Sequence, residues 1–105
     1  MSKNRDRGKR LERKIAERLG GKRTGVLGGE DVLHIYYSIE CKSRDKLPKW
    51  FDNFWKQTLA NCEEGKTPLL VIHQTNKNHD DDFVVIKLSD FESFCVTKPT
   101  EEGAS

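Results

Sequence analysis

The sequence predicts a mixed β-sheet with helices packed on it, an α/β fold that some schemes class as α+β. A chain of 105 residues fits one domain. Its hydrophobic pattern alternates between helical and strand spacing in the order α-β-β-β-α-β-β-α. A long amphipathic stretch joins the strand at Lys42 to an apolar strand at Leu69, which favours a parallel crossover. Hydrophobic and charged residues each make up 34%, so we expect a small core and a charged surface.

The first helix is expected from Gly8 to Leu19, after a disordered basic arm at residues 1–7. Its apolar stripe is Leu11, Ile15, Ala16 and Leu19, and Gly20-Gly21 ends it. Glu12 lies on the flank of that stripe, at the edge of whatever the helix packs on. An unpaired carboxylate is costly there. The alternative is an exposed Glu12 paired with a neighbour such as Arg13.

A short segment at 22–24 and a glycine-rich turn (Gly25, Gly28, Gly29) lead to a hairpin over Asp31–Lys42 that bends near 35–37. Asp31 opens the first strand, and Glu40-Cys41-Lys42 ends the second. On a strand, Glu40 and Lys42 project from one face while Ile39 and Cys41 project from the other. Cys41 is therefore expected to face the core.

The second half is expected to hold a helix over 48–64, ended by Gly65, and a strand over 68–73 whose unbroken apolar run indicates burial on both faces. A polar loop at 74–82, a strand at 83–88 and a capped helix at 89–94 follow. One domain spans 8–96, and the tail 97–105 is expected to be disordered. The aromatic residues at helical spacing are expected in the core or at a dimer interface rather than stacked on bases: Trp50, Phe51, Phe54 and Trp55.

Asp31 and Glu40 are oxygen ligands suited to a hard cation such as Mg²⁺, which can polarise a phosphate and activate water. Lys42 beside them can orient or deprotonate that water and offset phosphoryl charge. The alternative is that Glu40 and Lys42 form an ordinary ion pair on an exposed sheet face. The triplet alone does not decide between the two.

Taken together, Gly8–Arg13, Asp31-Val32 and Ile39-Glu40-Cys41-Lys42 resemble the PD-(D/E)xK nuclease superfamily. The closest resemblance is to archaeal-type and phage Holliday junction resolvases, and it runs from about Gly8 to Phe94. It implies a restriction-endonuclease-like αβββαβ core with a central mixed sheet flanked by helices, and a Mg²⁺-dependent endodeoxyribonuclease in which Mn²⁺ can substitute.

The same resemblance implies metal-site roles for Glu12, Asp31 and Glu40, a catalytic role for Lys42, and support from Gln57 on the following helix. Gln57 can equally be a polar residue on the outer face of that helix. Glu30 stands where the family has a proline, which leaves open whether Glu30 or Asp31 faces the metal, and we favour Asp31.

Residues 1–23 contain ten basic and three acidic side chains, a net charge of +7, so the rest of the chain carries −5. Such asymmetry fits a phosphate-backbone footprint, although a solvated charged helix gives the same count. The candidate DNA contacts are the basic residues that flank the motifs: Arg7, Lys9, Arg10, Lys22, Arg23, Arg44 and Lys46. The expected partners are branched DNA, above all a four-way junction, and a second copy of the chain, because paired symmetric cuts need two sites.

Two other functions remain open at this point: a flap, nick or general DNA endonuclease of the same superfamily, and a non-catalytic basic module that binds nucleic acid. Cys41, Cys62 and Cys95 are expected to be reduced thiols. With no long apolar run and no apolar segment behind the N-terminus, we expect a cytoplasmic protein of a prokaryotic or virus-infected cell. The histidines, His34, His73 and His79, lack metal-ligand spacing and are treated as incidental, and no phosphate-binding glycine loop is present.

Overall fold

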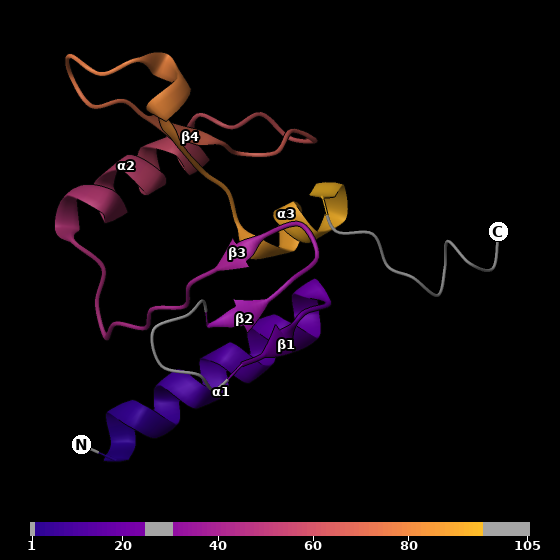
Figure 1. The fold of residues 1–105 in the computed structure, drawn as a ribbon. Helices are drawn as coiled ribbons and strands as arrows, with labels where there is room; N and C mark the ends of the chain where they lie inside the picture. Colours follow the sequence, from indigo (N-terminus) through magenta and orange to yellow (C-terminus); the bar gives the residue numbers. More distant parts are fainter. Residues whose placement is uncertain (1, 25–30, 96–105) are drawn as a thin grey trace, which may run out of the picture. The chain divides into compact units, whose positions relative to one another are not determined.

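The structure is a computed structural model that describes residues 2–24 and 31–95 (Figure 1). It is a mixed α and β fold, as expected at that level. Its elements are α1 (Ser2–Leu19), β1 (Lys22–Arg23), β2 (Val32–Leu33), β3 (Ser38–Ile39), α2 (Lys49–Ala60), β4 (Leu70–Ile72), the 3₁₀ turn η1 (His79–Asp81), β5 (Phe83–Val85) and α3 (Leu88–Cys95). The expected glycine-rich turn, Glu30 and the tail 97–105 lie outside the described residues.

The described strands form two small antiparallel sheets, β1-β2-β3 in the first half of the chain and β4-β5 in the second, and the single mixed sheet with a parallel crossover stays a prediction. β4 pairs with the strand that follows it, through a ten-residue connection at 73–82. A local hairpin closes a shorter loop than a helical crossover does, and its entropic cost is lower. The described residues up to Asp45, with Phe94 and Cys95, form one compact unit, and Lys46–Ser93 form a second, while the expected single domain stays a prediction.

In the first unit, α1 lies against β1 and β2 (Figure 1). Ala16, Leu19 and Val32 are the buried hydrophobic residues among those the structure describes, and Val32 is fully buried. The helix ends where expected, with Gly20 at a φ of 77° and the Gly21 N–H donating to the Ala16 carbonyl over 2.8 Å. The apolar stripe of the helix thus forms the centre of this unit.

The helix begins at Ser2, so the expected disordered arm at 1–7 is helical from its second residue. Lysine and arginine are good helix formers, and a single glycine such as Gly8 costs only about 1 kcal/mol inside a helix. An ion pair between Arg7 and Asp45 further holds the first turns of α1 to the segment after β3.

The expected hairpin is confirmed: β2 and β3 pair antiparallel, with Val32 opposite Ile39 and Leu33 opposite Ser38. β3 ends at Ile39, however, and the three residues Glu40–Lys42 lie just beyond the strand instead of ending it. The side chain of Asp31, rather than a backbone carbonyl, accepts the Cys41 N–H, and the strand ends three residues earlier than expected.

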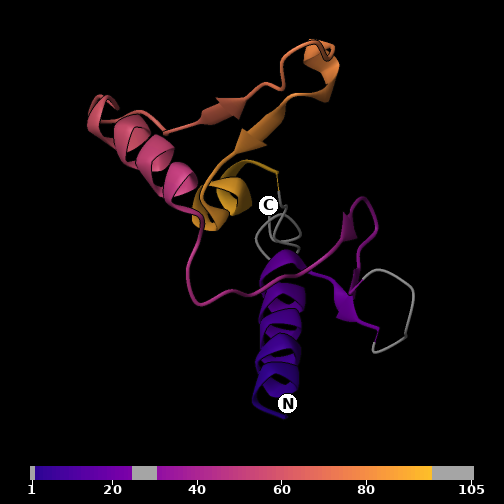
Figure 2. The same ribbon diagram turned by 90° about the vertical axis from the view of Figure 1, so that its left-hand side faces the viewer.

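In the second unit, α2 leads into the β4–β5 hairpin, which α3 follows (Figure 2). α2 begins after Pro48 and ends at Ala60, four residues before the expected end. β4 is not buried on both faces, because Val71 is 57% exposed. α2 contacts β4 but does not cover both faces of the two-stranded sheet, so Val71 remains exposed. In the described part of the chain, no helix has the length and apolar character that crossing a bilayer requires.

The aromatic residues of α2 are in contact with one another but only partly covered. The Trp50 and Phe54 rings meet edge to face with centroids 5.6 Å apart, and these side chains are 52% and 45% exposed. Phe51 and Trp55 are half-buried. Trp50 and Phe54 are thus only partly covered, and the expected placement of these aromatic residues in the core or at a dimer interface stays a prediction.

Gly21 is expected to be intolerant of any side chain. A Cβ there would lie 2.5 Å from the Leu33 carbonyl oxygen and 2.7 Å from Val32 Cγ1, so β2 would have to move away. Gly21→Ala should lower the free energy of unfolding by about 1–3 kcal/mol, measured by urea denaturation. Gly8→Ala is the matched control, because nothing lies within 4 Å of its Cβ position, and it should stabilise α1 by about 0.5–1 kcal/mol. Equal effects of the two substitutions would contradict this prediction.

Candidate functional site

Asp31 lies directly before β2, where the β2–β3 hairpin opens. Its backbone N–H donates to the Ile39 carbonyl over 2.9 Å, and its Oδ2 accepts the Cys41 N–H over 2.6 Å. The carboxylate therefore takes the place of a backbone acceptor beyond the last strand pair. This contact fixes Asp31 against the 40–42 segment that was predicted from the sequence to carry the chemistry.

Glu12 projects from α1 and forms an ion pair with Arg23 on β1. The Arg23 Nε donates to Glu12 Oε1 over 2.8 Å, and the two side chains are 28% and 20% exposed. Glu12 is therefore paired, and its partner is Arg23 rather than Arg13. A half-buried, charge-assisted hydrogen bond of this kind is stronger than an ordinary surface ion pair.

Glu40 and Lys42 also form an ion pair, with 3.3 Å between Glu40 Oε2 and Lys42 Nζ. Both side chains are well exposed, at 58% and 71%. An exposed pair of this kind contributes at most about 1 kcal/mol to stability. Both charged groups thus remain accessible from solvent, and the ion pair that the alternative interpretation expected is present.

Cys41 lies among the three predicted acids. Partial burial raises the pKa of its thiol, and the negative charges of Asp31, Glu12 and Glu40 raise that pKa further, in this order. The three carboxylates come from α1, from the residue before β2 and from the residue after β3, yet all act on this one sulfur. Cys41 is half-buried, in keeping with its expected inward direction, and both Cys41 and Cys62 are free thiols.

The three acids share a neighbourhood without forming a compact ligand set. In the described residues, a single group of three His, Cys, Asp or Glu side chains has its ligand atoms all within 4.8 Å of one another, and it consists of other residues. The carboxylates of Glu12 and Glu40 are instead turned to Arg23 and Lys42. Gln57 lies on α2 in the second unit, where its side chain is exposed, and its supporting role stays a prediction.

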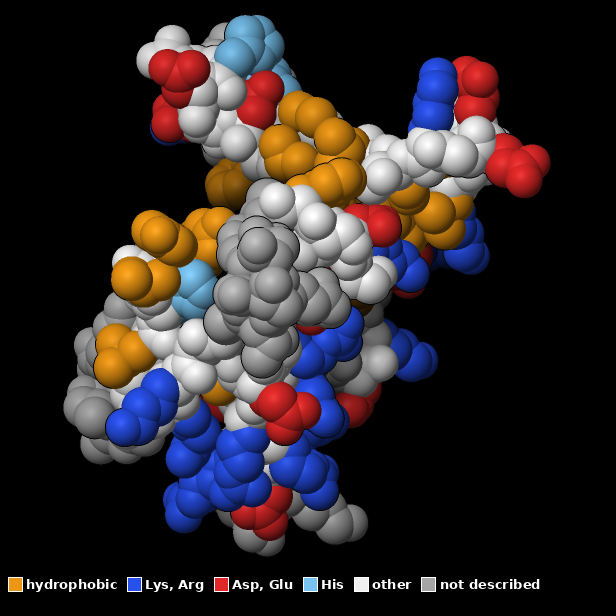
Figure 3. All heavy atoms as spheres, turned by 90° about the vertical axis from the view of Figure 1, so that its right-hand side faces the viewer, with side chains coloured by type: hydrophobic (Ala, Val, Ile, Leu, Met, Phe, Trp, Pro, Cys, Tyr) orange, Lys and Arg blue, Asp and Glu red, His pale blue; other side chains and the backbone are white. Residues whose placement is uncertain are grey.

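The predicted DNA contacts differ in how accessible they are. Figure 3 shows Lys and Arg side chains close together around α1. Arg7 is half-buried and pairs with Asp45, and Arg23 pairs with Glu12, which leaves both less suited to binding phosphate. Lys9 is half-buried. The exposed members of the predicted set are Arg10, Lys22, Arg44 and Lys46.

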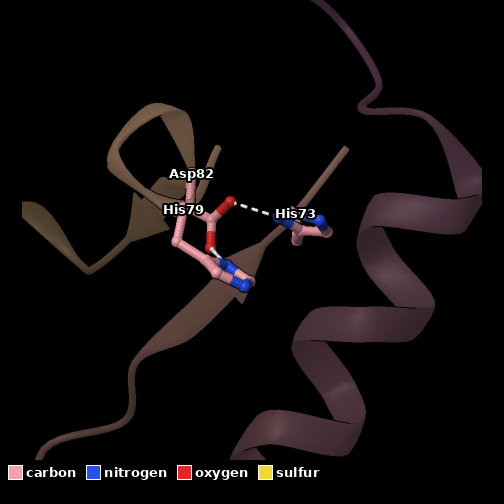
Figure 4. Close-up of side chains that lie close together, drawn as sticks. All are labelled: His73, His79 and Asp82. Atoms are coloured by element: carbon pink, nitrogen blue, oxygen red, sulfur yellow. Dashed lines mark hydrogen bonds and ion pairs between the residues drawn. The ribbon is translucent and has the colours of Figure 1, made fainter. Parts of the chain in front are cut away.

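A second cluster, not expected from the sequence, lies at the loop end of the β4–β5 hairpin, where residues 73–82 connect the two strands (Figure 4). His73 Nδ1 is 2.6 Å from Asp82 Oδ1, and His79 Nδ1 is 3.1 Å from Asp82 Oδ2. The hydrogen bond with His73, followed by that with His79, lowers the pKa of the Asp82 carboxyl. His73 and His79 were treated as incidental from their spacing in the sequence, whereas the structure brings both to the same carboxylate.

The sequence contained a signal for this cluster. His73 ends the predicted apolar strand, and Asp82 precedes the next one. Antiparallel pairing of these two strands places the two residues opposite each other. The ligands come together across a sheet rather than along the chain, so their spacing in the sequence does not reveal them.

No protein-family model, no curated protein and no solved structure matches the chain in our comparisons. What the site can do must therefore be argued from its own residues.

The charges around Cys41 predict an order of effects on its reactivity. Removing a negative charge lowers the thiol pKa, so more thiolate is present at a given pH and alkylation becomes faster. In a Cys62→Ser, Cys95→Ser background, Asp31→Asn should accelerate alkylation by iodoacetamide at pH 8 the most, followed by Glu12→Gln and then Glu40→Gln.

Glu17→Gln is the matched control for that series. Glu17 lies on the same helix as Glu12 but is exposed and paired with Lys14 over 3.4 Å. It should leave the pH profile of Cys41 alkylation unchanged. An equal shift in all four variants would show that the acids do not surround the thiol.

Proposed function

We propose that the chain is a metal-dependent, structure-selective DNA endonuclease, and specifically a resolvase that cuts four-way junctions near the crossover as a dimer. The observation that carries the proposal is the gathering of Glu12, Asp31 and Glu40 around Cys41, with Lys42 beside Glu40. The order α1-β1-β2-β3-α2-β4 is also the order of the nuclease core that the resemblance implies.

The donor set suits a hard divalent cation in its chemistry: three carboxylates supply oxygen ligands, and no imidazole is among them. Asp31 and Glu40, with Glu12, would hold Mg²⁺, or Mn²⁺ in its place. Such an ion supplies a Lewis acid for the phosphate and lowers the pKa of a bound water. Besides burial, the negative charges of Asp31, Glu12 and Glu40 raise the pKa of the Cys41 thiol, which supports a cation-binding role for these acids.

Lys42 and Arg23 have different tasks in this proposal. The exposed Lys42 ammonium can donate hydrogen bonds to a phosphoryl oxygen and offset the charge that develops there. Arg23 holds the Glu12 carboxylate at one fixed position, because its Nε donates to Oε1 over 2.8 Å. Exposed basic side chains such as Arg10 and Arg44 would bind backbone phosphates, which carry most of the affinity for DNA.

One observation favours a second candidate, a basic nucleic-acid-binding module without catalysis. Glu12 and Glu40 each already have a cationic partner, Arg23 and Lys42, so neither needs a metal to balance its charge. In this case the acids would serve the stability of the first unit. A flap, nick or general DNA endonuclease is the third outcome and shares its catalytic residues with the first.

Cleavage of labelled DNA separates these candidates. With Mg²⁺, the chain should nick a four-way junction symmetrically near the crossover and leave plain duplex intact, and EDTA should stop the reaction. Asp31→Asn and Lys42→Ala should each abolish cleavage while retaining binding, and Glu17→Gln should remain active. Preferred cutting of a flap would assign the third function, whereas junction binding without cleavage under any metal condition would assign the second.

Metal binding can be followed without any activity. Mg²⁺ bound among the three acids places positive charge near the Cys41 thiol, so Mg²⁺ should lower its pKa and accelerate its alkylation. Asp31→Asn should remove this response. A monomer by light scattering at micromolar concentration would contradict the dimer, and Cys41 alkylation that is indifferent to Mg²⁺ would contradict the metal site.

Salt dependence tests the DNA contacts. Each phosphate contact adds about 1 to the slope of log K against log salt concentration. Arg10→Ala and Arg44→Ala should each reduce this slope by about 1, measured by fluorescence anisotropy with a labelled junction in EDTA. Lys66→Ala is the control: its ammonium pairs with Glu63 over 3.2 Å in the second unit, and the slope should not change. An unchanged slope in the arginine variants would remove these residues from the interface.

A further inference from the structure

The loop end of the β4–β5 hairpin holds two imidazoles and one carboxylate in a fixed register. Ile72 pairs with Phe83, so the next residues outward, His73 and Asp82, are opposite each other across the two strands. His79 begins η1, and the Asp82 N–H donates to the His79 carbonyl over 3.0 Å. This turn brings the His79 side chain to the Asp82 carboxylate. Backbone hydrogen bonds of the hairpin and of η1 therefore place all three residues.

The three side chains converge on one point. The Asp82 carboxylate is 14% exposed and accepts from both rings, one on each oxygen. The rings of His73 and His79 lie 4.5 Å apart between centroids with a 33° tilt, and Figure 4 shows both directed at the carboxylate. The ligand atoms of all three side chains lie within 4.8 Å of one another.

These separations are close to those that a metal ion requires. Two ligand atoms at about 2.0–2.1 Å from a tetrahedral ion lie roughly 3.3 Å apart. The N–O separations of 2.6 and 3.1 Å are shorter by less than 1 Å, a difference that small side-chain rotations can supply. His79 is free to make such an adjustment because its side chain is 83% exposed.

We propose that His73, His79 and Asp82 bind a divalent transition-metal ion of the zinc type, with water completing its coordination. Imidazole nitrogen suits Zn²⁺ and its neighbours, whereas Mg²⁺ prefers oxygen ligands. The ion would replace the hydrogen bonds that join the rings to the carboxylate. Three protein ligands on an exposed hairpin end leave one coordination position open to solvent.

This site is independent of the proposed nuclease function. All three ligands belong to the second unit, and none is among the acids around Cys41. The competing interpretation is a hydrogen-bonded His-Asp-His cluster that stabilises the hairpin and binds no metal. A measurement of metal binding distinguishes the two whatever the nuclease assays show.

The test is isothermal titration of ZnCl₂ into the full, tag-free chain after EDTA treatment and dialysis, in a background in which Cys41, Cys62 and Cys95 are serine. One ion should bind per chain. His73→Ala, His79→Ala and Asp82→Asn should each weaken binding at least by the roughly 10- to 100-fold that loss of an outer-sphere partner costs. His79→Ala is the most informative variant, since so exposed a side chain is not needed for folding.

Asp80→Asn and Asp81→Asn are matched controls, because both aspartates are exposed in η1 next to the site but outside the triad. They should bind zinc like the unchanged chain. Long-range ¹H–¹⁵N spectra should show the ring nitrogens of His73 and His79 shifting with zinc while those of His34 do not. Absence of binding, or an equal loss in the Asp80 and Asp81 variants, would overturn the proposal.

Discussion

The hydrogen bond from the Cys41 N–H to the Asp31 carboxylate is the interaction on which the first unit's site depends. At 2.6 Å it continues the β2–β3 pairing by one residue, with a side-chain oxygen in place of a carbonyl. It lies just beyond the end of β3, and the neighbouring Glu40 and Lys42 side chains are exposed. The same contact places a negative charge beside the Cys41 thiol. Strand geometry and site electrostatics are thus set by one carboxylate.

The cost of gathering acids in this unit is offset by two cations in different environments. Arg23 meets Glu12 where both are largely covered, so this pair gains from reduced solvent screening, while Glu40 and Lys42 remain exposed. Glu12 is consequently held in place by Arg23, whereas the exposed Glu40 can exchange partners. Beneath them, the buried Val32 and the close approach of Gly21 to β2 keep the hairpin against α1.

Local patterns predicted the elements well, and pairing across distance poorly. The stripe ending at Leu19 and the bend between β2 and β3 follow from nearest-neighbour preferences that the sequence carries. The apolar run at 68–73 was assigned to a sheet buried on both faces because composition does not reveal the partner strand. Pairing with β5 exposes Val71 and brings His73 to Asp82. The exposure of Val71 and the histidine cluster thus both follow from the β4–β5 pairing, which the sequence pattern did not indicate.

The two clusters differ in the property that selects a metal. The acids around Cys41 offer only oxygen, and their negative charges together raise the pKa of the thiol, so a strongly hydrated ion suits them while keeping its waters. The hairpin cluster offers two nitrogens to one oxygen, and its carboxylate is already satisfied by hydrogen bonds. A metal must replace those bonds, so only an ion with high affinity for imidazole gains by entering. In the two proposals, ligand chemistry therefore assigns a different metal to each cluster.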